Sequence, residues 1–230
     1  MNKELLIFGA DGALGSGVTK VLSSKSYDKI HLFDFKFKNE IKGEKIKRYI
    51  IKDLSLEESV KNAFANLDAN KATTFYLFTT VGGFAGGNKI WETEIEEWDK
   101  MMKMNLTSSY LLAKYFSILV KNSNSGSICF TTAYTGLIPE VGKSAYGTSK
   151  SALIHLVKTL AEEGKAIKLS ANAIAPYIID TPANRSWMKD ADYDAWMKPD
   201  ELAELIHSLF ECHYFVSGNI ITLKHRFSIT

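Results

Sequence analysis

Cysteine is scarce in this sequence. The 230 residues include two, Cys129 and Cys212, which lie far apart and form no CxxC or Cys/His cluster. This spacing argues against a disulfide framework and against a zinc site, so no metal is expected. It is typical of a protein in a reducing compartment.

A charge imbalance and long apolar runs are missing as well. The formal net charge is +2, which is too small to favour nucleic acid or a membrane surface as a partner. No apolar run reaches the ~18–20 residues that a transmembrane helix needs. The chain enters a strand-like run, Leu5–Phe8, without a signal-peptide pattern before it. These absences predict a cytoplasmic protein with neither a membrane nor a nucleic-acid partner.

The sequence does contain apolar, β-branched runs that alternate with amphipathic stretches. The expected strands are Leu5–Phe8, Ile30–Phe35, Tyr49–Ile51, Thr74–Thr79, Ser127–Thr132, Leu169–Ala175 and Asn219–Leu223. The expected helices are Ser16–Ser24, Leu56–Leu67, Glu94–Lys121, Ala145–Glu162 and Pro199–Glu211. Continuous apolar strands separated by helices indicate a parallel sheet covered on both faces. We therefore expect one α/β domain over residues 1–230, doubly wound around a mostly parallel seven-stranded sheet.

A glycine-rich turn joins the first expected strand to the first helix. It runs Gly9-Ala10-Asp11-Gly12-Ala13-Leu14-Gly15-Ser16-Gly17. Glycine lets the backbone turn tightly and approach a pyrophosphate, which sits at the helix N-terminus. Such turns also serve plain strand–helix packing, but here an acidic residue, Asp34, follows about 20 positions on, at the end of the second strand. The combination predicts a Rossmann-type dinucleotide site in which Asp34 accepts hydrogen bonds from the adenine ribose.

The choice between NAD and NADP stays open at this point. Asp34 should repel the extra phosphate of NADP, which favours NADH. Lys36 and Lys38 follow at once, within a basic stretch that ends at Lys47-Arg48. That stretch is either a solvated loop or a site for the phosphate, so NADPH use remains possible. Asp53, after the third strand, either contacts the adenine or caps a helix.

Tyr146-Gly147-Thr148-Ser149-Lys150 places a tyrosine and a lysine four residues apart at the start of an expected helix. Positions i and i+4 share a helix face, so the phenol and the ammonium can point into one pocket. A phenol ionises with a pKa near 10, and a nearby cation stabilises the phenolate. The pair is suited to acid–base chemistry.

With this motif the chain resembles the short-chain dehydrogenase/reductase family over essentially its whole length. The resemblance implies that Tyr146 donates or accepts a proton, and that Lys150 binds the nicotinamide ribose and lowers the pKa of the tyrosine. It also implies that Asn105 helps to hold a water relay.

Three departures from the general family pattern point to one branch. Ala13 follows Gly12 where the family has a glycine. The segment Val81-Gly82-Gly83-Phe84-Ala85-Gly86-Gly87-Asn88 replaces the usual Asn-Asn-Ala-Gly, and Ala133 stands where the family has its catalytic serine. Together with Asp180-Thr181-Pro182-Ala183-Asn184-Arg185, these features resemble the dihydropteridine reductases.

The resemblance implies NAD(P)H-dependent reduction of quinonoid dihydropteridine to tetrahydropteridine. Phe84, Ala133 and Tyr146 would line the substrate site, where Phe84 either stacks on the pterin ring or serves as a packing plug. Residues Thr181–Lys198 would form an irregular lid. The residues expected to hold the cofactor are Gly9, Gly12, Ala13, Leu14, Gly15, Asp34, Asp53, Gly82, Tyr146, Lys150, Pro176 and Thr181.

The resemblance further implies a homodimer built on the two long helices. Their apolar positions include Leu106, Tyr110, Leu111, Leu153, Leu156 and Leu160.

Two alternatives remain. A carbonyl or quinone reductase of the same family would need Thr131, Thr132 or Thr135 to replace the missing serine, whereas a conjugated pterin presents no single ketone to orient. A catalytically idle NAD-binding regulator is disfavoured by the intact Tyr146/Lys150 pair.

Overall fold

Seven parallel strands form one sheet at the centre of the molecule. In the computed structural model, which describes residues 1–39 and 43–227, the strand order is β3-β2-β1-β4-β5-β6-β7. Each strand runs parallel to its neighbours. The strands are β1 Asn2–Phe8, β2 Lys29–Asp34, β3 Ile46–Ile50, β4 Thr73–Thr79, β5 Ser125–Thr131, β6 Leu169–Pro176 and β7 Ile220–Leu223. The doubly wound sheet is confirmed, and its described strands are parallel throughout.

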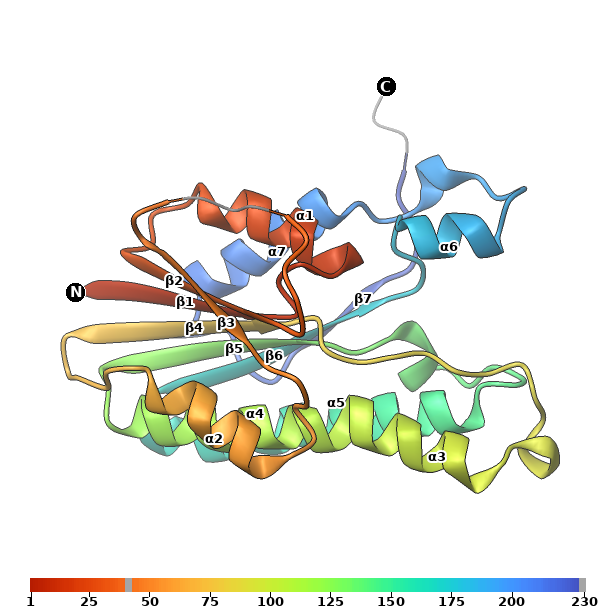
Figure 1. Cartoon of the computed structure of the whole chain (residues 1–230), viewed down its shortest axis with the longest axis horizontal. Coiled ribbons are helices and arrows are strands. Elements are labelled where there is room, and N and C mark those ends of the chain that lie inside the picture. The colour runs from red at the N-terminus through yellow and green to blue at the C-terminus, as the bar shows by residue number, and fades with distance from the viewer. Residues whose placement is uncertain (40–42, 228–230) are drawn as a thin grey trace.

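Helices cover both faces of the sheet. Figure 1 shows α1 and α7 on one face and α2, α4 and α5 on the other. The helices are α1 Ala13–Ser23, α2 Glu57–Ala65, α3 Ile95–Met101, α4 Ser108–Lys121, α5 Ser144–Gly164, α6 Pro182–Trp187 and α7 Pro199–Glu211. Neighbours along a strand point to opposite faces. Leu5 and Ile7 therefore pack in the cluster that includes α1 and α7, while Leu6 and Phe8 pack in the cluster on the other side.

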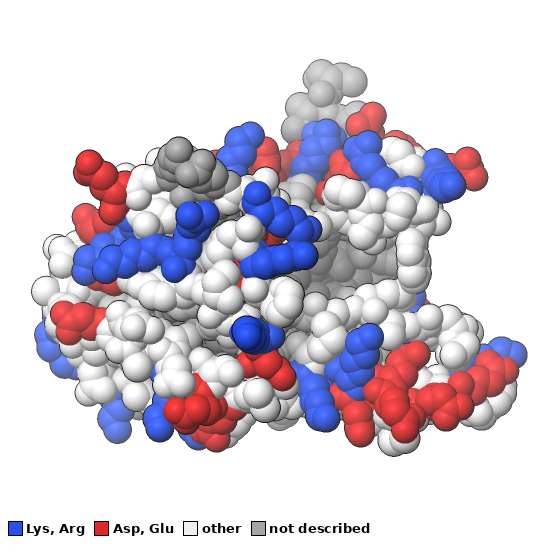
Figure 2. Space-filling view, viewed as in Figure 1, with Lys and Arg blue, Asp and Glu red and all other residues white. Residues whose placement is uncertain are grey.

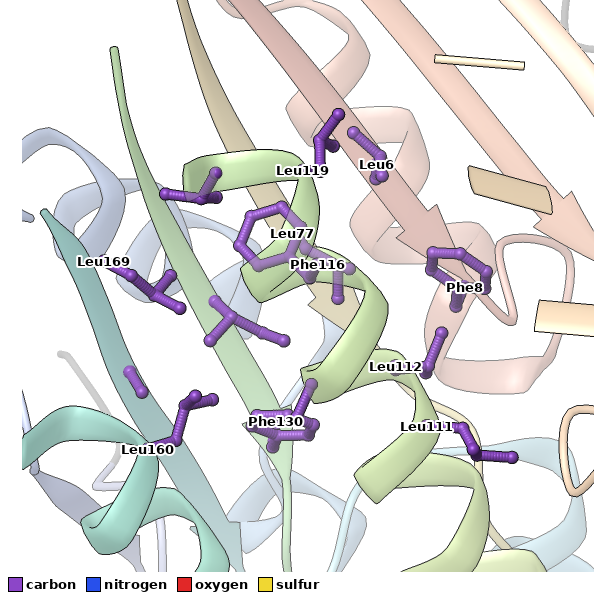
Figure 3. Packing of buried hydrophobic residues seen from close by; sticks show 14 of the residues in the cluster. Leu6, Phe8, Leu77, Leu111, Leu112, Phe116, Leu119, Phe130, Leu160 and Leu169 are labelled. Carbon is purple, nitrogen blue, oxygen red and sulfur yellow. The ribbon is translucent and has the colours of Figure 1, made fainter. Parts of the chain in front are cut away.

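The core beneath α4 anchors the middle of the sheet. Phe116 and Leu112 of this helix are fully buried and belong to one cluster with Phe8, Leu77 and Phe130 of three neighbouring strands (Figure 3). Fully burying one such side chain contributes about 1.5–3 kcal/mol. The carboxyl ends of β1, β4 and β5 are thus held by a tightly packed interior.

The helix expected over Glu94–Lys121 is not uniformly α-helical. Between α3 and α4 the backbone takes a π-helical turn, Met102–Thr107. Such turns insert an extra residue and are frequent at functional sites. This one contains Asn105, a candidate site residue.

The lid also differs from its expectation. Within Thr181–Lys198 lie a short helix, α6, and a 3₁₀ turn at Tyr193–Ala195. Thr181 starts α6 as its N-cap, because its hydroxyl oxygen accepts a hydrogen bond from the Asn184 N–H at 3.2 Å. Within the described ranges, no helix combines the length and hydropathy that crossing a membrane would require.

Candidate active site

The glycine turn has the tight packing that its sequence predicts. Gly9 has φ +79°, and its N–H donates to the Phe33 carbonyl at 2.8 Å. A Cβ at Gly15 would lie 1.8 Å from the carbonyl oxygen of Gly9, so the first turn of α1 rests directly on the strand end. Gly12 is the exposed N-cap of α1, and no side chain makes a capping hydrogen bond there. The backbone there can receive a phosphate.

A cavity of about 420 Å³ opens at the carboxyl ends of β1, β2 and β4. This is the edge where ligands bind in doubly wound sheets, at the point where the strand order reverses. Its lining includes five of the residues expected to hold the cofactor: Gly9, Gly12, Asp34, Asp53 and Gly82. The others lie outside this lining: Ala13, Leu14 and Gly15 in α1, Tyr146 and Lys150 in α5, Pro176 at the end of β6 and Thr181 just before α6. On the face shown in Figure 2 the surface is hollowed, and Lys and Arg side chains gather beside the hollow.

Asp34 lines this cavity and is hydrogen-bonded to the backbone of Asp11. One Asp34 oxygen accepts from the Asp11 N–H at 2.8 Å, and the other accepts from the Phe35 N–H at 2.7 Å. The Asp11 carboxylate accepts from the Asn39 side-chain amide at 2.7 Å and from the Lys38 N–H. Burial raises the pKa of Asp11, but these hydrogen bonds outweigh it and leave the pKa below its ordinary value. Lys38 and Asn39, at the start of the loop after β2, are therefore held to the Asp11 carboxylate beside Asp34.

Asp53 has a local structural role in addition to its place in the cavity wall. One of its oxygens accepts from both the Ser55 N–H, at 2.8 Å, and the Ser55 hydroxyl, at 2.7 Å. This turn precedes α2. Lining the cavity and supporting the turn are compatible, because a carboxylate has several acceptor sites.

Tyr146 and Lys150 lie on the same side of α5, as their spacing predicts. The Lys150 ammonium is 6.0 Å from the centroid of the Tyr146 ring, and it donates to the Thr131 carbonyl at 2.9 Å. Lys150 is 4% exposed. Burial lowers its pKa to about 8.

The pKa of Tyr146 is shifted in the direction opposite to the expected one. Burial raises it to about 12, and the negative charge of Glu140 adds to the rise. The lowering of this pKa that the resemblance implies for Lys150 is not seen in this structure, because burial dominates. The ammonium is directed at the Thr131 carbonyl, and burial disfavours its own charge.

Asn105 is hydrogen-bonded to the backbone of Gly83, in the loop that follows β4. Its Oδ1 accepts from the Gly83 N–H at 2.8 Å, and its Nδ2 donates to the Gly83 carbonyl at 3.1 Å and to the Ser149 hydroxyl at 2.9 Å. A Cβ at Gly82 would lie 2.6 Å from Asn105 Oδ1 and 3.1 Å from Lys150 Nζ. The loop after β4, the π turn and α5 therefore meet here, where a side chain at position 82 would not fit.

Three aromatic rings meet beside these groups. Phe84 contacts Tyr146 edge-on, with ring centroids 5.0 Å apart, and Trp187 of α6 in the same manner at 5.7 Å. Phe84 is 44% exposed and Trp187 is 75% exposed. Both rings therefore present free apolar surface next to the Tyr146 side chain.

The threonines around Ala133 all use their hydroxyl protons within the protein. Thr131 donates to the Thr79 carbonyl at 2.8 Å, Thr132 donates to the Ile174 carbonyl at 2.9 Å, and Thr135 donates to Glu140. In this arrangement no donor remains among the three to replace the serine hydroxyl that position 133 lacks.

Glu140 and Lys143 are not among the residues predicted from the sequence. Glu140 accepts from Thr135 and, at 3.1 Å, from the Lys143 ammonium, which also lies 5.9 Å from the Phe84 ring centroid. A charged pair three residues apart, just before the Tyr-x-x-x-Lys motif, was the available signal. It was not distinguishable from an ordinary surface ion pair.

The residues present fit a dinucleotide. No side chain makes a capping hydrogen bond at the Gly12 terminus, and a Cβ at Gly82 would clash with Asn105 beside Lys150. The cavity joins these backbone features to the Asp34 carboxylate. Gly9, Gly12, Asp34 and Lys150 are the residues that would hold the cofactor.

Comparison with known proteins agrees with this geometry. The family model described as short chain dehydrogenase matches residues 3–192. A dihydropteridine reductase from Dictyostelium discoideum is 32% identical over 213 residues, which cover 92% of this chain and 87% of that protein.

Solved structures share the fold. ElxO with NADP bound superposes with a TM-score of 0.84 at 23% identity, covering 97% of this chain and 98% of that one. The ligand-free aldohexose dehydrogenase of Thermoplasma acidophilum superposes with a TM-score of 0.82 at 22% identity, covering 97% and 92%. The chain belongs to the short-chain dehydrogenase family and is an NAD(P)H-dependent oxidoreductase.

Proposed function

We propose that this enzyme reduces quinonoid dihydropteridine to tetrahydropteridine and prefers NADH. The observation that carries the proposal is the set of hydrogen bonds around Ala133. A ketone reductase of this fold needs a hydroxyl there to orient the carbonyl and stabilise the developing oxyanion, and losing one such donor typically costs roughly 10²–10³-fold. The hydroxyl protons of Thr131, Thr132 and Thr135 are directed at protein acceptors.

A quinonoid pterin tolerates this arrangement. Its conjugated ring accepts the electron pair over several atoms, so no single oxygen has to be fixed. The exposed faces of Phe84 and Trp187 offer apolar, flat surface for such a ring next to Tyr146. The similarity to the dihydropteridine reductase of Dictyostelium discoideum supports the same substrate class.

Proton transfer is assigned to Tyr146. When bound, reduced nicotinamide supplies a hydride, and the reduction of a C=N bond also consumes one proton. With its raised pKa, Tyr146 is a neutral phenol at physiological pH and carries that proton. Lys150, held by the Thr131 carbonyl, provides the positive charge that stabilises the phenolate left behind. Asn105 links the Gly83 backbone to Ser149 of α5 through its hydrogen bonds.

NADH preference follows from Asp34. Its carboxylate faces the cavity and would repel an additional phosphate. The basic residues of the adjacent loop oppose this effect, so the preference is one of degree.

The test is turnover by the purified protein, followed as loss of NADH absorbance. A quinonoid dihydropterin is compared with a panel of ketones, aldehydes and quinones at matched concentrations. We expect kcat/KM for the pterin to exceed that for any carbonyl by on the order of 10²-fold. Preference for a carbonyl substrate would replace this proposal with a carbonyl or quinone reductase.

A further inference from the structure

A second cavity lies at the edge of the sheet opposite the cofactor cavity. Its volume is about 780 Å³, and its lining includes Thr74, Ser125 and Leu169, at or next to the amino ends of β4, β5 and β6. Because the strands are parallel, these ends share the edge at which β1 begins, marked N in Figure 1. The volume lies within the roughly 300–1,000 Å³ of small-molecule sites. The linings of the two cavities have no residue in common.

The charges that line this cavity are positive. Lys3, Lys165 and Lys168 belong to the lining, whereas no Asp or Glu is among its described residues. Lys3 is paired with Glu211 at 2.8 Å, and Lys165 is paired with Glu162. Lys168 has no ion-pair partner in the part of the chain that the structure describes. An anionic ligand would therefore meet one cation whose charge is not already compensated.

Lys168 has a left-handed backbone conformation. Its φ is +57° and its ψ is +41°, and within residues 1–39 and 43–227 it is the one residue other than glycine with a positive φ. Glycine or asparagine adopts this conformation at lower cost. A lysine is nevertheless present here, beside the cavity. A side chain kept in an unfavourable backbone conformation points to a role for that side chain.

The hydroxyl of Tyr76 has no hydrogen-bond partner among the described residues. Tyr76 lines the cavity and is 2% exposed. Its ring contacts the rings of Phe210 and His213, at centroid distances of 5.3 and 5.5 Å. The one fully enclosed side-chain polar atom without a partner in the described ranges is Ser23 Oγ, so the Tyr76 hydroxyl is reached from the cavity. Buried hydroxyls ordinarily have a partner, and this one is available to a ligand.

Two exposed aromatic rings also line the cavity. Tyr214 and Phe215, which follow α7, are 79% and 66% exposed, and their ring centroids are 4.8 Å apart. These rings offer apolar surface to a flat ligand. An inorganic anion would leave that surface unused, and the described lining contains no arginine to bind a phosphate in a bidentate manner. The combination favours a carboxylate carried on an aromatic ring.

We propose that this cavity is a second binding site, which takes a small aromatic carboxylate with a further hydrogen-bond acceptor. The Lys168 ammonium attracts the carboxylate, the Tyr76 hydroxyl donates to the other acceptor, and Tyr214 and Phe215 contact the ring. The inference goes beyond the proposed function and does not depend on it, because no residue of the cofactor cavity takes part.

The experiment is an NMR titration of the ¹⁵N-labelled full chain with saturating NADH, which occupies the cofactor cavity. The probe is 6-hydroxy-2-naphthoate, and its uncharged amide is the matched control. We expect the backbone amide signals of Ser125, Lys168 and Ser170 to shift and those of Gly12 and Gly82 to stay, with a Kd of roughly 0.1–1 mM. The amide should bind at least about threefold more weakly. Shifts confined to the carboxyl edge, or equal affinity for the amide, would overturn the proposal.

Two substitutions of Lys168 separate its charge from its backbone conformation. Lys168→Asn removes the charge and suits a positive φ, and it should raise the Kd roughly three- to tenfold. Lys168→Arg keeps the charge and should bind the probe within about twofold of wild type. An unchanged Kd in Lys168→Asn, or an equal loss in Lys168→Arg, would contradict the assignment.

Tyr76→Phe removes the free hydroxyl and keeps the ring. It should weaken probe binding by roughly two- to tenfold, the usual effect of one hydrogen bond. Thermal unfolding verifies that each variant is folded. If Tyr76→Phe does not fold, the two Lys168 variants still decide the outcome, and an unaltered Kd in folded Tyr76→Phe would remove the hydroxyl from the site.

Discussion

The ring of Phe84 meets the ring of Tyr146 edge-on, with centroids 5.0 Å apart and planes inclined by 79°. Phenylalanine at position 146 preserves this contact and removes only the hydroxyl. We therefore expect Tyr146→Phe to lose roughly 10²- to 10⁴-fold in kcat, the usual contribution of general acid–base catalysis. NADH affinity, measured by fluorescence titration, should stay close to that of wild type. Activity within about threefold of wild type would remove Tyr146 from the mechanism.

Asp34 provides the test of cofactor choice. Removing its charge should lower the ratio of kcat/KM for NADH to kcat/KM for NADPH by roughly tenfold, because the repulsion of the additional phosphate disappears. Asp34→Ala also removes the acceptor for the Asp11 and Phe35 N–H groups. Asp34→Asn, which retains an acceptor oxygen without the charge, is the matched control and should show the same narrowing. If the wild-type enzyme already prefers NADPH, the basic loop outweighs Asp34.

Ala133 distinguishes the two substrate classes. Ala133→Ser restores the hydroxyl that ketone reductases use, so any weak ketone activity should rise while pterin reduction stays within about tenfold of wild type. Thr132→Val should also spare pterin turnover, because the Ile174 carbonyl keeps its bond from the Thr132 N–H at 2.8 Å. A loss of about 10²-fold in Thr132→Val or Thr135→Val, with fold and NADH binding intact, would identify a hydroxyl that orients a carbonyl.

The buried Lys150 should make the free energy of unfolding depend on pH. Burial lowers its pKa in the folded state from 10.5 to about 8. Between these values the unfolded chain binds more protons than the folded protein, so this group makes the free energy of unfolding rise with pH. Lys150→Met should be more stable than wild type near pH 7, by about 1–3 kcal/mol. The difference, measured by denaturant unfolding at a series of pH values, should shrink above pH 8. A difference that is independent of pH would mean that the lysine is equally protonated in both states.

The outer face of α4 is where we expect a second copy of the chain to bind. Of the apolar residues that the sequence places on the long helices, Leu111, Leu153 and Leu160 are buried in the core, whereas Tyr110 is 52% exposed. Ile118, two turns after Tyr110, is 50% exposed. A homodimer paired through this face should sediment as twice the chain mass at micromolar concentration, and Ile118→Glu should shift it toward monomer. Lys121→Glu, at the end of the same helix, is the control for added charge. A wild-type monomer would contradict the prediction.

The elements of the fold could be predicted because their signals are local. Continuous apolar runs such as Thr73–Thr79 are buried on both faces, and the glycine turn is fixed by its own packing. The site was partly predictable for the same reason. Tyr146 and Lys150 share a face because four residues make about one turn of α-helix.

What the sequence did not reveal depends on contacts between distant segments. The direction of a threonine hydroxyl, such as Thr132 to Ile174, depends on the neighbouring strand. Glu140 contacts Thr135 and Lys143, which lie within five residues of it, but no motif marks these contacts. The raised pKa of Tyr146 reflects burial, which a Tyr-x-x-x-Lys spacing does not report.

The π turn at Met102–Thr107 changes the direction in which α3 presents its side chains relative to α4. Each residue of an α-helix advances the direction of its side chain by about 100°, so one inserted residue rotates α3 relative to α4 by roughly that angle. Leu112 and Phe116 of α4 lie in the core, and Asn105, in the turn itself, is hydrogen-bonded to the Gly83 backbone. The extra residue therefore lets α3 and α4 present their side chains in directions that are set separately.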